Sequence, residues 1–165
     1  MEQPIAPVTI LAGLWKFVVA AGAGAILGVP AQVRRRPGGI RTHALVSLGA
    51  SVFCMTAIAV VGGESAEVLR VLQGITAGVG FIGAAALLRG DRIVQGINTA
   101  ASIWIAAGVG SAISFIRSPV LGLLAALVAT VINGVFMELD LRMERRVQAG
   151  GGEAAGRGGG GSPGS

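Results

Sequence analysis

Five long apolar runs, separated by short segments rich in charge, glycine or proline, dominate the pattern along the chain. They cover approximately residues 10–29, 44–61, 73–88, 97–115 and 119–139. Backbone N–H and C=O groups that face lipid can be satisfied only within a helix or a closed barrel, and helices of this length match the thickness of a bilayer. The pattern therefore predicts an all-α polytopic membrane protein, a bundle of five transmembrane helices.

The third and fourth runs form the centre of this prediction, over Gln73–Trp104. A short charged turn that contains Arg89, Asp91 and Arg92 separates them. Two apolar segments joined so tightly must cross back past each other. We therefore expect a transmembrane helical hairpin here.

The arginines predict which side of the membrane each loop occupies. Ten of the thirteen Lys and Arg residues fall in the segments after the first, third and fifth runs. The segments after the second and fourth runs hold only Arg70 and Arg117. Short loops rich in arginine stay in the cytoplasm. We therefore expect the amino terminus outside and the carboxyl terminus in the cytoplasm.

The last residues differ in composition from the rest. Residues 1–146 are predicted to form the transmembrane domain, and residues 147–165 form a tail rich in glycine. Such a tail cannot bury enough apolar surface to offset the entropy lost on ordering, so we expect it to be disordered.

Composition excludes several classes of protein. The chain is 53% hydrophobic and 13% charged, with a mean hydropathy of +0.76, which is outside the range of water-soluble globules. The membrane topology explains the net charge of +5. Tyr is absent and aromatic residues make up only 4%, so we expect no nucleic-acid partner. The single Cys54 can form no internal disulfide and is predicted to pack as a small apolar residue.

One motif imitates a nucleotide site. Gly78, Gly80 and Gly83 spell GxGxxG, which binds dinucleotides only between a strand and a helix and with an acidic residue about 20 positions later. Here the glycines lie inside an apolar run, so we interpret them as helix-packing positions. The glycines assigned to helix packing are Gly24, Gly28, Gly74, Gly78, Gly80 and Gly83.

The inventory of reactive side chains predicts a protein that is not an enzyme. The only histidine, His43, lies at the start of the second run and has no obvious carboxylate partner, so we interpret it as an interfacial residue. No HExxH, CxxC or Walker lysine is present, and no Asp or Glu lies in the interior of a predicted span. We therefore expect no catalytic residue, no metal site and no cofactor.

Polar residues inside the spans need partners in lipid. We expect them to point inward and to form hydrogen bonds between helices, as structural contacts or as a binding site. They are Gln73, Thr76, Asn98, Thr99, Ser102, Thr130 and Asn133. Lys16, inside the first run, is interpreted either as snorkelling to the nearer headgroups or as a functional charge within the membrane.

Two stretches resemble the MgtC/SapB family of bacterial inner-membrane proteins. They are GGIRTHALVSLGAS (38–51) and GVGFIGAAALLRGDRIVQGINTAASIW (78–104), which follow the family's two sequence elements in order and spacing. The resemblance implies a five-helix membrane domain, a bacterial inner-membrane location and a role in adaptation to low magnesium and intracellular survival. The positions at which the family pattern falls here are Arg41, Thr42, Arg89, Asn98, Thr99 and Trp104.

The chain departs from the family pattern in three places, one of which is Gly83-Ala84-Ala85, where the family has G-A-G. Family members usually have an acidic-basic pair after the first helix, where this chain has Gly28-Val29-Pro30-Ala31-Gln32. Many members also have a soluble carboxy-terminal domain, where this chain has a glycine-rich tail. The resemblance implies modulation of a membrane ATPase or of the membrane potential through a membrane-protein partner or a homo-oligomer. The alternative is a small oligomeric transporter or channel for an ion or a small solute.

Overall fold

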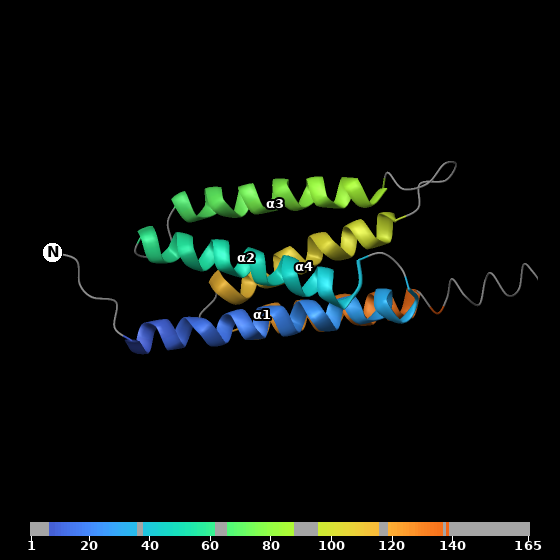
Figure 1. Ribbon diagram of the computed structural model, residues 1–165, viewed down its shortest axis with the longest axis horizontal. Helices are drawn as coiled ribbons and strands as arrows, with labels where there is room; N and C mark the ends of the chain where they lie inside the picture. Colours follow the sequence, from blue (N-terminus) through green and yellow to red (C-terminus); the bar gives the residue numbers. More distant parts are fainter. Residues whose placement is uncertain are drawn as a thin grey trace, which may run out of the picture. The chain divides into compact units, whose positions relative to one another are not determined.

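A computed structural model of the chain describes residues 7–35, 38–61, 66–87, 96–115, 119–136 and 138. The regular elements in these ranges are all α-helices (Figure 1). They are α1 (Pro7–Val33), α2 (Ile40–Val61), α3 (Ala66–Leu87), α4 (Ile97–Phe115) and a shorter fifth helix, Val120–Phe136. The all-α prediction is confirmed.

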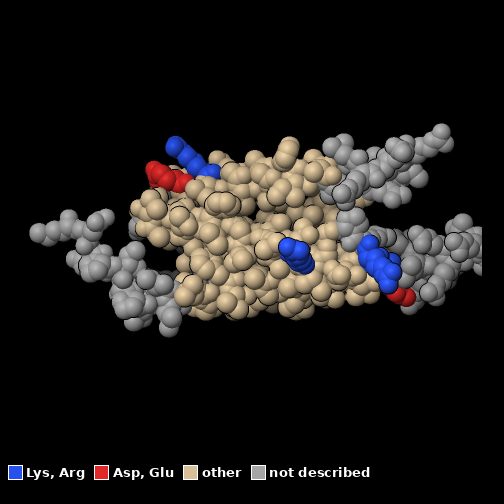
Figure 2. Space-filling model, in the orientation of Figure 1, with Lys and Arg blue, Asp and Glu red and all other residues tan. Residues whose placement is uncertain are grey.

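Four of these helices, α1 to α4, are long and apolar enough to cross a membrane, whereas the fifth is shorter. The surface in Figure 2 agrees with this, because most of the described face is uncharged and only isolated blue and red side chains interrupt it. Five spans, with the amino terminus outside, stay a prediction. The charged turn with Arg89 and the tail 147–165 lie outside the described residues.

Two units make up the chain, Met1–Thr130 and Val131–Ser165. The first holds α1 to α4 and the beginning of the fifth helix, and the second holds the end of that helix. All packing described below belongs to the first unit.

Within the first unit, α2 and α4 lie between α1 and α3 (Figure 1). Both middle helices contact α1 and α3, and α1 and α3 do not contact each other. In the most apolar stretch of α4, 56% of the residues are buried, against 17% in α3. Thus α4 is the most enclosed of the four long helices and α3 is the most exposed.

Small residues fill the two apolar clusters of the interior. One cluster joins α1, α4 and the fifth helix, and the other joins α2, α3 and α4. Their buried members are Ala20, Ala23, Val109, Ile113 and Ala126 in the first, and Ala50, Val79, Ile103 and Ala107 in the second. Small side chains let helix backbones approach closely, which is how helices associate where lipid removes the hydrophobic driving force.

Helix boundaries differ from the prediction at three places. We expected Pro30 to end the first helix, but α1 continues to Val33, because a proline removes one ladder hydrogen bond without preventing the next residues from being helical. α2 begins at Ile40, one turn earlier than expected. α3 begins at Ala66, so Glu67, expected in a loop, lies in a helical first turn, where an acidic residue interacts favourably with the helix dipole.

A tight turn joins α1 to α2 and sets the start of α2. Arg35 and Gly38 adopt left-handed backbone angles, with φ values of 53° and 76°. A methyl group at Gly38 would also lie 2.8 Å from Thr99 Cγ2, so the position requires glycine for its backbone angle and for its contact with α4. The Gly39 carbonyl then accepts the first hydrogen bond of α2, from the His43 N–H at 3.2 Å.

Candidate functional site

A stripe of polar residues runs along the buried face of α2. His43, Ser47 and Ser51 recur every four residues, so they share one face of the helix. Each of the three is 0% exposed, because α1 and α4 cover this face. Together with Ser102 and Ser114 of α4, they form what we call the polar seam.

At the start of α2, His43 links two helices. Its Nδ1 lies 3.0 Å from the Gly39 carbonyl oxygen, and its Nε2 lies 2.9 Å from Ser102 Oγ of α4. Ser102 Oγ is also 2.9 Å from the Thr99 carbonyl oxygen, to which it can donate. The imidazole thus joins the α1–α2 turn to the beginning of α4.

The protonation of the imidazole decides whether His43 and Ser102 donate or accept in these hydrogen bonds. A carbonyl oxygen only accepts, so Nδ1 of His43 carries a proton. In a neutral ring, Nε2 then accepts from Ser102, whose only hydroxyl proton is no longer available to Thr99. In a charged ring, Nε2 donates to Ser102, and Ser102 donates to Thr99. One rotation of a hydroxyl accommodates either state of the imidazole.

Further along the seam, serines join the three helices. Ser47 Oγ donates to the Ala20 carbonyl of α1 at 2.7 Å. Ser51 Oγ and Ser114 Oγ lie 2.7 Å apart, and Ser114 Oγ also reaches the Ser51 and Gly110 carbonyls, at 3.2 and 3.1 Å. The seam hydroxyls are thus hydrogen-bonded to one another or to backbone carbonyls.

Lys16 stabilises the end of α4. Its Nζ donates to the Ser114 carbonyl oxygen at 3.2 Å, and the side chain is half-buried. Ser114 lies in the last turn of α4, where carbonyl groups lack intrahelical donors and the helix dipole is negative. The ammonium group thus binds a neighbouring helix end, and both sequence-based interpretations of Lys16 stay predictions.

Glycines allow the backbones around the seam to touch. A methyl group at Gly24 of α1 would lie 2.6 Å from Ser47 Cβ, and one at Gly28 would lie 2.7 Å from Ile40 Cα. A methyl group at Gly110 of α4 would overlap the Ser47 carbonyl. The helices thus pack backbone to backbone at these three glycines.

The predicted polar residues are placed differently from our expectation. Gln73 and Asn98 are exposed, and Thr76 and Thr130 donate to carbonyls of their own helices at 2.9 and 2.7 Å. Of the residues expected to bond between helices, Ser102 does so through His43. Gln73 and Asn98 lie on faces of α3 and α4 that no described helix covers.

His43 and the other predicted site residues differ in how far they are buried. His43 is buried among α1, α2 and α4, although we expected it at the interface, because α4 covers its side of α2. Arg41 is exposed and Thr42 is half-buried. On α4, Thr99 is 8% exposed and Trp104 is 50% exposed. Arg89 is outside the described residues.

The α3 glycines face open space. A methyl group at Gly74, Gly78 or Gly80 would meet nothing within 4 Å, whereas one at Gly83 would contact Ala100 of α4 at 3.4 Å. The GxGxxG sequence lies inside a continuous helix, as expected. Three of the four α3 glycines are therefore available to something outside the described part of the chain.

A pocket of about 410 Å³ opens between α3 and α4. Thr76 and Trp104 line it together with Ser111. Ser111 Oγ is buried and lies beside the Cys54 side chain of α2. Across those same residues, no group of three or more His, Cys, Asp or Glu side chains could hold a metal ion.

Comparison with known proteins identifies relatives. Residues 17–142 match the MgtC family. SrpB of Synechococcus elongatus is 37% identical over 111 residues, which cover 60% of this chain and 61% of that protein. MgtC of Salmonella typhimurium is 39% identical over 87 residues, which cover 53% of this chain and 36% of that protein. The chain thus spans only part of these relatives. No solved structure matches it.

Proposed function

Because the chain belongs to the MgtC family, we propose that it is a non-enzymatic regulator that acts through helix contacts with another membrane protein. The partner that we propose is a membrane ATPase, which the protein modulates, together with the membrane potential, during adaptation to low magnesium and intracellular survival. We place this activity in a bacterial inner membrane. The relatives named MgtC support this role, and the exposed side of α3 and α4 supports the mode of action.

The observation that supports a partner most strongly is Gln73. It lies two turns into α3, inside a candidate span, and its side chain is exposed. An amide that faces hydrocarbon loses its hydrogen bonds with water, and a second helix can restore them. Polar residues within membrane helices are accordingly functional candidates.

Trp104 supports the same surface from α4. Its side chain is 50% exposed and borders the α3–α4 pocket, which the hydroxyl-bearing Thr76 also lines. Large aromatic residues contribute most of the binding energy at many protein interfaces. A helix seated against this pocket would bury Trp104 and offer partners to Gln73.

The polar seam favours this mode of action over transport. Its hydroxyls and imidazole are hydrogen-bonded to one another and to backbone carbonyls. A permeating ion would have to replace those bonds with its own ligands, and Gly24 and Gly110 hold the backbones in contact around them. The seam therefore acts as a structural core in our proposal.

Site-specific photo-crosslinking in native membranes tests the proposal. A photoreactive amino acid at position 73 or 104 should capture a subunit of a membrane ATPase. The control is position 26 on α1, because Ile26 is 52% exposed and thus as accessible as Trp104. If positions 73 and 104 give no ATPase product, or position 26 gives the same product, the proposal is wrong.

A functional variant provides the second arm. Trp104→Ala should leave folding intact, because half of the side chain is already exposed, yet it should impair growth at low magnesium. The matched variant Ile26→Ala should leave growth unchanged.

A further inference from the structure

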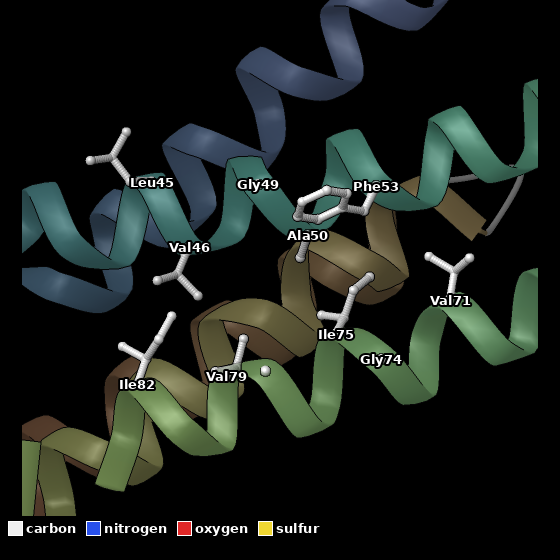
Figure 3. Close-up of a pocket in the computed structure, with 11 residues that line it drawn as sticks. Leu45, Val46, Gly49, Ala50, Phe53, Val71, Gly74, Ile75, Val79 and Ile82 are labelled. Atoms are coloured by element: carbon white, nitrogen blue, oxygen red, sulfur yellow. The ribbon is translucent and has the colours of Figure 1, made fainter. Parts of the chain in front are cut away.

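An apolar groove of about 590 Å³ separates α2 from α3 (Figure 3). Val46 of α2 and Ile75 of α3 point into the space between the helices (Figure 3). Leu45 and Ile82 line one end of the groove, and Phe53 lies toward the other. All the side chains that line it are apolar.

Glycines make the groove deep. Gly49, Gly74 and Gly78 line it, and a methyl group at any of these positions would meet nothing within 4 Å. A glycine within a helix costs up to about 1 kcal/mol relative to alanine, and here no internal contact requires it. The space that the glycines leave is therefore available to a molecule outside this chain.

The surroundings of the groove determine which kind of molecule can occupy it. Both α2 and α3 are candidate membrane spans, so the groove opens toward hydrocarbon. Water does not fill a space with apolar walls, because it finds no hydrogen-bond partners there. A lipid acyl chain has the matching chemistry and a slender form that suits a groove.

Charge at the two ends of the groove selects the headgroup. Arg41 is exposed and lies one helical turn before Leu45, at the end of the groove that follows the arginine-containing α1–α2 turn. At the other end, Arg70 precedes Val71, but the acidic Glu67 lies one turn away on the same helix. The Arg41 end is thus the more positive one, and guanidinium groups bind phosphate through paired hydrogen bonds.

We propose that the α2–α3 groove binds an anionic phospholipid. One acyl chain lies in the groove, along Gly49, Gly74 and Gly78, and the phosphate lies against Arg41. The proposed partner surface is on the other side of Ile75, around the α3–α4 pocket that Trp104 lines.

Native mass spectrometry of the purified full-length chain tests the proposal. The probes are phosphatidylglycerol and phosphatidylcholine with identical acyl chains. One arginine at a membrane surface contributes about fivefold in affinity, so the wild-type chain should prefer phosphatidylglycerol by about that factor. Arg41→Gln should abolish the preference, and Arg70→Gln should retain it.

A second pair of variants tests the groove itself. Gly74→Leu places a side chain where the acyl chain would lie, and should weaken binding of both lipids relative to the wild-type chain. Gly80→Leu is the matched control, because Gly80 also faces open space but does not line the groove. It should bind both lipids as the wild type does.

Three results would overturn the proposal. The first is equal binding of both lipids by the wild-type chain. The second is a Gly74→Leu variant that binds them as tightly as Gly80→Leu does. The third is loss of the preference for phosphatidylglycerol in Arg70→Gln and not in Arg41→Gln. Because none of these variants changes Trp104 or Gln73, failure here is distinguishable from failure of the proposed regulatory function.

Discussion

Replacing Gly110 by alanine adds a methyl group at the closest contact between α2 and α4. The new methyl would overlap the Ser47 carbonyl oxygen, which belongs to the backbone and cannot rotate away. The two helices must therefore separate. Separation also lengthens the bond between Ser51 and Ser114, which now measures 2.7 Å.

The expected loss can be worked out from opposing terms. Alanine is favoured over glycine in a helix by up to about 1 kcal/mol. Overpacking typically costs about 1–3 kcal/mol, and an interhelical hydrogen bond in a membrane protein contributes about 0.6 kcal/mol on average. Because the obstacle is backbone, we expect the upper part of that range. With an overpacking cost of about 2–3 kcal/mol, the three terms together predict that the free energy of unfolding falls by about 2 kcal/mol.

Gly108→Ala is the matched control on the same helix. A methyl group at Gly108 would meet nothing within 4 Å, so only the helix-propensity term applies. This variant should be as stable as the wild type or more stable by up to about 1 kcal/mol. The assay is denaturant unfolding of both variants in detergent, followed by tryptophan fluorescence. Equal stability of the two variants would refute backbone contact between α2 and α4.

Four further substitutions, in three tests, probe the polar contacts of the interior. Ser51→Ala and Ser114→Ala should couple by about 0.6–1.7 kcal/mol in a double-mutant cycle of unfolding free energies, and additive losses would show that the two hydroxyls do not bond. Lys16→Met should cost about 0.3–2 kcal/mol and speed amide hydrogen exchange near the end of α4, whereas unchanged exchange would contradict the contact with the Ser114 carbonyl. His43→Leu should cost about 1–3 kcal/mol, because it leaves Ser102 without its partner on α2, and a stability equal to that of the wild type would contradict the bond.

The sequence predicted the elements better than their ends. Apolar runs longer than a buried strand leave only helices as the solution in lipid, and α4 has the predicted bounds, Ile97–Phe115. The end of α1 was mispredicted because Pro30 reads as a stop, although a proline near the last turn disturbs only one hydrogen bond.

The polar contacts were harder to predict, for a physical reason. Gln73 and Asn98 were expected inside because polar groups in lipid need partners, but no described helix covers the faces of α3 and α4 on which they lie. The buried bonds between helices come instead from His43 and from serines. The spacing of His43, Ser47 and Ser51 is visible in the sequence and could have indicated a buried stripe, whereas only the packing of α4 on α2 reveals which helix covers it.

Ion transport by the purified protein provides the most direct test, because we propose that the polar seam is a closed core and that the functional contacts are on the outside. The measurement is Mg²⁺ and K⁺ flux into liposomes that contain the full-length chain as the only protein. The account predicts flux equal to that of protein-free liposomes. Saturable flux that Ser51→Ala or Ser102→Ala alters would show that ions pass along the seam and would contradict the account.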